Sequence, residues 1–212
     1  TAVEGRPVPM KLTPPAAEMF DTLGRHSTFV YRMIFANLWL FRPVLDALCK
    51  KQGGEMNALM RTTCAFTMME GSRQSNVIPP QAKVGANLRL IGGDTMESAL
   101  RYLRATVRNP DIDITAVQGM NPSPYSDTKG EGWRRLKTAI GQSWPEAIVS
   151  PYLMIACSDS RHFCRISDAV MRFSAMALSG EERALIHGNN ERIPVQKIAD
   201  TVAFYIRLIR LS

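Results

Sequence analysis

The chain has 212 residues, enough for one ordinary domain or two small ones, and 45% of them are hydrophobic while 21% are charged. This composition excludes collagen-like and wholly disordered proteins, because there is ample apolar surface to bury. The net charge of +7 is spread thinly: basic and acidic residues number nine and six in 1–75, nine and eight in 76–160, and eight and five in 161–212. We therefore expect no nucleic-acid partner.

Four cysteines stand far apart, with no Cys-x-x-Cys pair, which predicts free and mostly buried thiols in an intracellular protein. The most apolar stretch, residues 29–49, is interrupted by Arg32 and Arg42, with only nine uncharged residues between them. A membrane-spanning helix needs about 20. We expect no membrane span and no signal peptide, and a cytoplasmic location. The cysteines are Cys49, Cys64, Cys157 and Cys164.

Helices are predicted first along the chain. Residues 15–23 form a short helix with proline at its start. Ser27 caps a longer helix that runs to Trp39. Pro43 then begins or kinks a helix that ends at the glycines 53 and 54.

The pattern next changes to that of strands. Residues 62–69 are rich in threonine, and residues 82–90 alternate between polar and apolar side chains. A capped helix follows at about 95–108, and residues 112–117 alternate as a third strand.

A loop rich in Pro, Ser and Gly at 119–132 is the predicted domain boundary. Strands and helices alternate beyond it, so the chain reads as an α+β unit followed by part of an α/β unit. The predicted elements are a helix at about 131–142, a strand at 148–156, a short helix after Ser158 or Asp159, a strand near 169–173 and an amphipathic helix at 195–210.

Self-contained catalytic motifs are absent from the sequence: there is no nucleophile elbow, P-loop, dinucleotide-binding glycine motif or zinc-protease helix motif. The three histidines, His26, His162 and His187, are too few for a histidine-rich metal site. Ser160 and His162 are two residues apart, and on a helix such a pair points to different sides, which argues against a nucleophile and its base.

Three polar patches each allow two interpretations. His187 lies in a polar loop before a helix, where it is either a ligand or part of an ordinary capped turn. Asp159 and Arg161 follow an apolar segment, where α/β proteins place their sites, yet they equally suit a helix cap. Asn76 lies in a turn and Arg89 ends the next strand thirteen residues later, which by themselves indicate a turn residue and a surface charge.

In this order, the patches resemble motifs of the zinc-dependent aminoacylase and carboxypeptidase family. The branch that the chain most resembles is that of carboxypeptidase S and the N-fatty-acyl-amino-acid hydrolases, because an apolar segment NLWLF at 37–41 precedes a strand that begins RTT at 61–63. The other motifs are NVIPP at 76–80, Arg89, SDSRHF at 158–163 and HGNNERIPV at 187–195.

The resemblance implies the fold class: an α+β ferredoxin-like lid domain followed by the C-terminal part of an α/β zinc-hydrolase catalytic domain. Residues 1–119 would form the lid, with a helical insert at about 14–60, and residues 120–212 the C-terminal part of the catalytic domain. The start without an initiator methionine also suggests a fragment. Most zinc ligands and the general base would then precede Thr1, so we expect no catalytic residue within this chain, weak zinc binding and no hydrolysis by the chain alone.

The resemblance also implies the roles of five residues. His187 would be the one ligand that this chain gives to the two zinc ions of the complete enzyme. Asn76, Arg89, Asp159 and Arg161 would bind substrate. Arg89 would hold a free carboxylate and Asn76 would help to form the oxyanion hole, with both side chains facing one cleft if the strands pair as a hairpin.

The implied activity is cleavage of the amide bond of N-acyl amino acids or of peptides with a free carboxylate, by a zinc-bound water. Implied partners are the substrate, the N-terminal part of the catalytic domain and a second copy through the lid. The alternative is a non-catalytic lid-type binding or dimerisation module. The chain departs from the family at Ala156-Cys157 and after Arg89, and the apolar insert at 28–49 either lines an acyl channel or is plain lid core.

Overall fold

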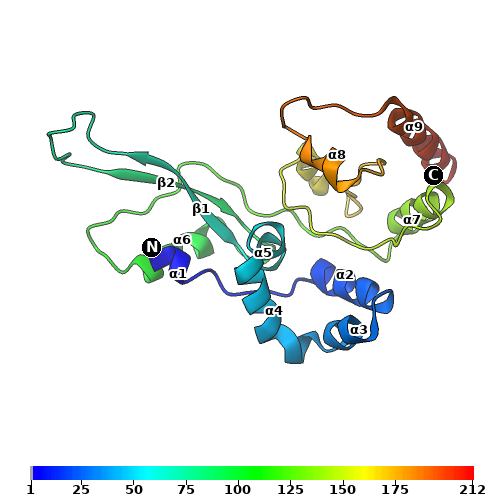
Figure 1. Ribbon diagram of the computed structural model, residues 1–212, viewed down its shortest axis with the longest axis horizontal. Coiled ribbons are helices and arrows are strands. Elements are labelled where there is room, and N and C mark those ends of the chain that lie inside the picture. The colour runs from blue at the N-terminus through cyan, green and yellow to red at the C-terminus, as the bar shows by residue number, and fades with distance from the viewer. Residues whose placement is uncertain (1) are drawn as a thin grey trace. The chain divides into compact units, whose positions relative to one another are not determined.

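The computed structural model describes residues 2–212, and at Gln52 the backbone alone. The chain divides into two compact units (Figure 1). The first unit comprises Thr1–Pro124 and Tyr152–Cys157, and the second comprises Tyr125–Pro151 and Ser158–Ser212.

The first unit combines helices with one antiparallel pair of strands, so the predicted α+β class is confirmed. Helices are present near the predicted ranges 15–23, 27–39, 43–53 and 95–108, and a further helix lies at 54–60. The second of them ends at Ala36, so Trp39 belongs to the next helix and Pro43 lies inside that helix rather than at its start. The elements are α1 (Ala2–Gly5), α2 (Pro14–Arg25), α3 (Phe29–Ala36), α4 (Leu38–Gln52), α5 (Gly54–Met60), β1 (Thr63–Glu70), β2 (Lys83–Arg89) and α6 (Met96–Val107).

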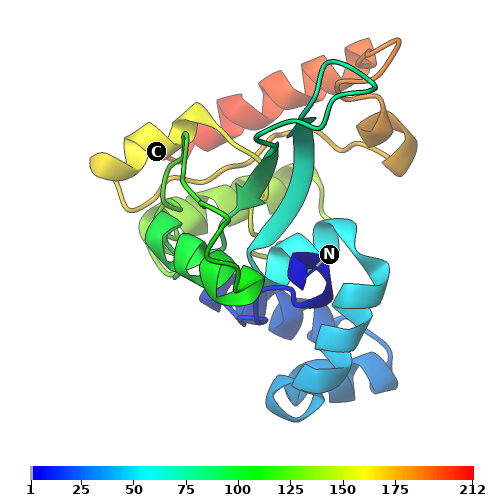
Figure 2. The ribbon, with the colours of Figure 1, turned by 90° about the vertical axis from the view of Figure 1, so that its left-hand side faces the viewer.

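The strands β1 and β2 form a long hairpin that extends away from α2, α3 and α4 (Figures 1 and 2). Its ladder runs from the pair Thr63 and Arg89 to the pair Glu70 and Lys83. The register shifts by one residue at Thr67, because Phe66 pairs with Ala86 while Met68 pairs with Gly85. This β-bulge leaves Thr67 as the extra residue of β1.

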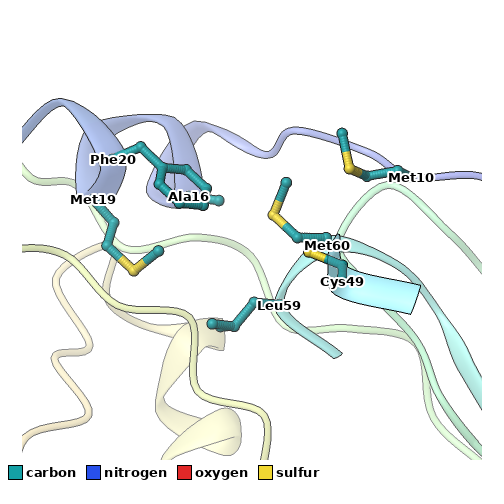
Figure 3. Close-up of a cluster of buried hydrophobic side chains, with 7 residues drawn as sticks. All are labelled: Met10, Ala16, Met19, Phe20, Cys49, Leu59 and Met60. Carbon is teal, nitrogen blue, oxygen red and sulfur yellow. The ribbon is translucent and has the colours of Figure 1, made fainter. Parts of the chain in front are cut away.

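A hydrophobic cluster joins α2, α4 and α5 (Figure 3). Phe20 of α2 lies against Phe35 of α3, with ring centroids 5.1 Å apart. The two helices approach closely at Gly24, where an added Cβ atom would lie 3.0 Å from the Cβ of Phe35. The buried members of the cluster are Met10, Ala16, Met19, Phe20, Cys49, Leu59 and Met60.

A buried ion pair ties α4 to the start of β1. The guanidinium of Arg61, whose side chain is 1% exposed, donates to the carboxylate of Asp46 and, at 2.9 Å, to the carbonyl of Val8. Lys50 also pairs with Asp46, at 2.7 Å. Burial raises the pKa of Asp46, but hydrogen bonds from Lys50 and Arg61 outweigh burial and hold that pKa below its ordinary value.

The second unit packs α7 (Glu131–Ser143) against α9 (Val195–Arg210). Phe204 of α9 is fully buried, and its ring lies 5.5 Å from that of Trp144 and 5.3 Å from that of Phe173. The predicted helices at 131–142 and 195–210 are confirmed. The unit also contains the 3-10 helix η1 (Asp159–Arg165) and the short α8 (Gly180–Ala184).

Three predicted strands, at 112–117, 148–156 and 169–173, are not strands in this structure. Alternation favours a strand only where a partner strand accepts its hydrogen bonds, and within residues 2–212 the sheet consists of β1 and β2 alone. Apolar side chains of these segments are exposed, including Ile112, Val117 and Ile148.

The four cysteines are free, as predicted, but they are not mostly buried. Cys49 is buried, Cys64 and Cys164 are half-buried, and Cys157 is exposed. Burial raises the pKa of Cys49 and, likewise, the pKa of the Cys64 thiol.

Candidate functional site

Asn76 and Arg89 lie far apart on the hairpin. Arg89 is the last residue of β2 and pairs with Thr63 at the base of the ladder, whereas Asn76 lies in the exposed turn beyond its other end. Six residue steps separate Lys83 from Arg89, and at ~3.3 Å a step the ladder alone spans about 20 Å. The structure therefore does not bring the two side chains of one chain into a common cleft, because hairpin pairing sends the turn away from the base.

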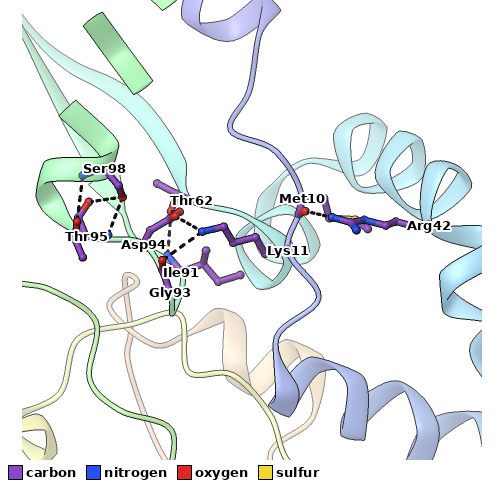
Figure 4. A network of polar contacts seen from close by, with 9 residues as sticks. All are labelled: Met10, Lys11, Arg42, Thr62, Ile91, Gly93, Asp94, Thr95 and Ser98. Carbon is purple, nitrogen blue, oxygen red and sulfur yellow. Dashed lines mark hydrogen bonds and ion pairs between the residues drawn. The ribbon is translucent and has the colours of Figure 1, made fainter. Parts of the chain in front are cut away.

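A polar network holds the chain where β2 ends (Figure 4). The amide of Ile91 donates to the hydroxyl of Thr62 at 3.1 Å, and that hydroxyl donates to the carboxylate of Asp94. Lys11 forms an ion pair with the same carboxylate. These bonds connect the segment before α2 to both strand ends, two residues from Arg89.

The guanidinium of Arg89 is exposed and donates a hydrogen bond to the carbonyl of Ile155, in the segment 152–157 of the same unit. A guanidinium has five N–H donors in a planar fork, so one carbonyl does not exhaust its capacity. This arrangement can hold a carboxylate in two parallel bonds. Sequence reasoning missed the contact with Ile155, because nothing in the sequence links residues 66 positions apart.

Asp159 and Arg161 lie in η1, where the predicted short helix is found. The hydroxyl of Ser158 accepts a hydrogen bond from the amide of Ser160 at 3.3 Å, so the segment has the helix cap that the plainer interpretation expected. Asp159 is exposed and Arg161 is half-buried. The hydroxyl oxygen of Ser160 is buried without a hydrogen-bond partner.

His187 lies in the turn that follows α8. Its φ angle of 61° is in the left-handed region, which few non-glycine residues adopt. The amide of the next residue, Gly188, closes the turn by donating to the carbonyl of Leu185 at 2.9 Å. The imidazole is exposed, and none of the residues 2–212 forms a hydrogen bond with it.

The loop around His187 is anchored at both sides. Ser179 and Glu182 form a capping box at the start of α8, and the Ser179 backbone bond lowers the pKa of Glu182. Lys197 of α9 donates to the carbonyl of Ala177 and lies 3.5 Å from the carboxylate of Glu182. The turn thus connects two helices that Lys197 links together.

No group of three or more His, Cys, Asp or Glu side chains within residues 2–212 is placed to hold a metal ion. An exposed imidazole suits one position of a zinc site, which in proteins has three or four protein ligands. His187 therefore fits the role of a single ligand.

Three comparisons with known proteins indicate which protein family the chain resembles. Residues 24–115 match the peptidase dimerisation domain. The chain is 31% identical over 193 residues to a probable carboxypeptidase S-like protein of Dictyostelium discoideum, covering 91% of this chain and 37% of that protein. It is 34% identical over 199 residues to an N-fatty-acyl-amino acid synthase/hydrolase of Xenopus tropicalis, covering 93% of this chain and 39% of the relative. No solved structure matches significantly.

The fold and these matches define an α+β protein with a peptidase dimerisation domain. The chain belongs to the aminoacylase and carboxypeptidase family that includes carboxypeptidase S and the N-fatty-acyl-amino-acid hydrolases. It spans less than two fifths of the length of the two relatives described. Within residues 2–212, none of the helices has the length and hydrophobicity needed to cross a bilayer.

Proposed function

We propose that the chain is the lid, residues 1–119, and the C-terminal catalytic portion, residues 120–212, of a zinc-dependent amidohydrolase. Its substrates are N-acyl amino acids or peptides with a free carboxylate. The observation that carries this proposal is the similarity over about nine tenths of the chain to both a carboxypeptidase S-like protein and an N-fatty-acyl-amino acid synthase/hydrolase. The names of both relatives refer to compounds, C-terminal peptides and N-acyl amino acids, in which a free carboxylate lies next to an amide bond.

Arg89 is the carboxylate-binding residue in this proposal. Its charge is permanent, its side chain is exposed, and its position is held by the bond to Ile155 and by the network around Asp94. A bidentate bond to the substrate carboxylate would place the neighbouring amide at a fixed distance from the guanidinium.

Asn76 serves the same reaction from a second copy of the chain. One molecule cannot bring Asn76 to the carboxylate held by its own Arg89, because the ladder keeps them about 20 Å apart. A homodimer through the lid, which the match to a peptidase dimerisation domain supports, supplies Asn76 from the hairpin turn of the partner.

Asp159, Arg161 and His187 belong to the catalytic portion. His187 would hold zinc through its exposed imidazole, and the remaining ligands would come from outside this chain. Zinc, when bound, lowers the pKa of a water molecule toward neutrality and so prepares it to attack an amide carbonyl. Arg161, half-buried in η1 beside the exposed Asp159, would contribute to binding the substrate.

The test is hydrolysis by the whole gene product. N-acyl amino acids and their C-terminal amides would be offered in parallel, with and without a chelator. We expect turnover of the free acids, much slower turnover of the amides, and loss of activity on chelation that added zinc restores. Equal rates on acids and amides would refute the carboxylate specificity.

A second candidate is a non-catalytic dimerisation or binding module. It is favoured by the match to a dimerisation domain over residues 24–115. Under this alternative the whole gene product forms dimers but hydrolyses none of these compounds at any zinc concentration.

A further inference from the structure

Three consecutive residues before β1 are almost completely buried. Met60, Arg61 and Thr62 are 0%, 1% and 2% exposed. The amide of Lys11 donates to the carbonyl of Met60 at 2.8 Å, and the guanidinium of Arg61 is bound to Asp46. The backbone at the base of the hairpin is therefore held from several sides before the strand begins.

The strands themselves have little packing to hold them in place. β1 is exposed from Ala65 onward, and most residues of β2 are exposed, Arg89 included. A two-stranded hairpin is only marginally stable by itself. The hydrogen bonds at the base of the hairpin therefore decide where the last residue of β2 lies.

The hydroxyl of Thr62 is the point at which these bonds meet. It accepts from the amide of Ile91, two residues after Arg89, and donates to the carboxylate of Asp94 (Figure 4). Thr62 is directly followed by Thr63, the ladder partner of Arg89. A hydroxyl serves as donor and acceptor at once, so this one ties the buried base to the chain that carries Arg89.

The carboxylate of Asp94 is itself fixed. Its side chain is 11% exposed and forms an ion pair with Lys11. The ammonium of Lys11 also donates to the carbonyl of Gly93 at 3.4 Å. Because the backbone of Lys11 is bound to Met60, the acceptor of the Thr62 hydroxyl is anchored to the same buried segment.

We propose that Thr62 is a positioning residue for carboxylate recognition: its hydroxyl holds the end of β2, so that the guanidinium of Arg89 keeps one orientation. This inference rests on the proposed role of Arg89 as the carboxylate-binding residue. A bidentate bond requires two N–H groups to point at two oxygens together. A binding group has to be held within about 0.5 Å of its productive position, and an arginine on an exposed strand meets that requirement only if the strand end is fixed.

A residue that only stabilises the fold would behave differently. Loss of stability lowers the fraction of folded molecules, so it lowers the rates on free acids and on amides by the same factor. A displaced guanidinium lowers the rate on free acids alone, because a C-terminal amide has no carboxylate to hold. The acid-to-amide ratio, kcat/KM for a free acid divided by kcat/KM for its amide, therefore separates the two roles.

The test compares Thr62→Val with Thr62→Ser in the whole gene product. Valine has nearly the shape of threonine but no hydroxyl, whereas serine keeps the hydroxyl. Thr62→Val should lower kcat/KM on free acids by about tenfold, mainly by raising KM, and leave the amides within about twofold. Thr62→Ser should keep the acid-to-amide ratio within about twofold of that of the unaltered protein.

A second variant keeps the test independent of how Thr62→Val folds. Lys11→Met removes the ion pair to Asp94 at a side chain that is 42% exposed, and it should lower the acid-to-amide ratio by about threefold or more. The matched control is Lys83→Met, which removes an exposed charge from the other end of β2 and should leave the ratio unchanged. Circular dichroism should be the same for all of these variants.

The Arg89→Ala background shows whether Thr62 acts through the guanidinium. Once Arg89 is removed, Thr62→Val should change the acid-to-amide ratio by no more than about twofold, because two changes that act through one group are not additive.

Two results would overturn the inference while leaving the proposed function in place. One is that Arg89→Ala lowers the acid-to-amide ratio whereas Thr62→Val and Lys11→Met leave it unchanged. The other is that Thr62→Val lowers the ratio equally with and without Arg89. A ratio that Arg89→Ala itself does not change would refute the proposed role of Arg89, and the inference would fall with it.

Discussion

Asn76 and Arg89 are thirteen residues apart in the sequence and lie at opposite ends of one ladder: Arg89 is paired at its base, and Asn76 lies past the pair of Glu70 and Lys83 at the other end. The two residues therefore experience different surroundings. Arg89 is held by a carbonyl of its own unit, and Asn76 lies in an exposed turn. Their contributions to catalysis should be separable by mutation.

In the whole gene product, Arg89→Ala should lower kcat/KM on free-acid substrates by roughly 10- to 150-fold, since a charge-assisted bond contributes ~1.5–3 kcal/mol. C-terminally amidated substrates should lose much less. Asn76→Ala should act mainly on kcat, because an oxyanion donor matters most in the transition state. Lys83→Ala, at the other end of β2, is the control for a lost surface charge. Equal losses on acid and amide would make Arg89 a structural residue.

The dimer adds a complementation test. If Asn76 acts from the partner, mixing the impaired Asn76→Ala and Arg89→Ala proteins should raise the activity to about a quarter of that of the unaltered protein in a random mixture, because half of the dimers are mixed and each has one intact site. No recovery in a mixture that demonstrably exchanges subunits would place both residues in one molecule or neither in the site.

His187→Asn should reduce bound zinc in the whole gene product while leaving the fold intact. Asparagine tolerates the left-handed conformation that His187 adopts, so the change removes the imidazole with little backbone strain. The control is His162→Asn, an exposed histidine of η1 in the same unit. Metal analysis after dialysis checks the prediction, and equal zinc content in the two variants would remove His187 from the metal site.

Acid should weaken the link between Asp46 and Arg61. The pKa of folded Asp46 lies below its ordinary value of 3.8, so its ionised form stabilises the fold at higher pH, and this contribution is lost as pH falls through the folded pKa. Asp46→Asn should therefore lower the free energy of unfolding by roughly 2 kcal/mol at pH 7, because it leaves the buried Arg61 without its counter-charge and a hydrogen bond to a charged group contributes ~1.5–3 kcal/mol. The difference should shrink below pH 3.8.

The control for this measurement is Asp21→Asn. Asp21 pairs with Arg25 at 2.9 Å on the surface, where both side chains are more than half exposed. Surface pairs of this type contribute about 0–1 kcal/mol. Denaturant titrations across pH compare the two, and an Asp46 variant that behaves like the Asp21 variant would contradict the importance of the buried pair.

The same change, glycine to alanine, should have opposite effects at two positions. Gly24→Ala should destabilise by about 1–3 kcal/mol, because the new methyl would lie 3.0 Å from the Cβ of Phe35 between α2 and α3. Gly141→Ala, in α7 with no atom within 4 Å of the new Cβ, should stabilise by about 0.5–1 kcal/mol. Thermal unfolding of the two variants checks the signs.

The helices were predictable from the sequence because their signals are local. The proline at the start of α2, Thr95 at the cap of α6 and the apolar period of α9 all act within a few residues. The alternating pattern at 112–117 predicted a strand that the structure does not contain, since a strand depends on a partner that the alternating pattern does not specify.

The candidate site was predictable only as residue types. Asn76, Arg89 and His187 were found through their motifs, but the motifs gave no distance between them. The separation of Asn76 from Arg89 follows from the ladder, and the hold of Ile155 on Arg89 follows from tertiary packing. Neither the separation nor the bond to Ile155 can be read from the residues next to these positions in the sequence.

The bulge in β1 has a consequence for how this hairpin tolerates changes in length. Because Thr67 has no partner of its own, removing it would leave Phe66 opposite Ala86 and Met68 opposite Gly85, with every side chain on its present face. Removing any paired residue instead would shift the rest of β1 by one place and exchange its two faces. Natural single-residue deletions in this strand should therefore be most frequent at Thr67, where a deletion shortens the strand without moving any other side chain to the opposite face.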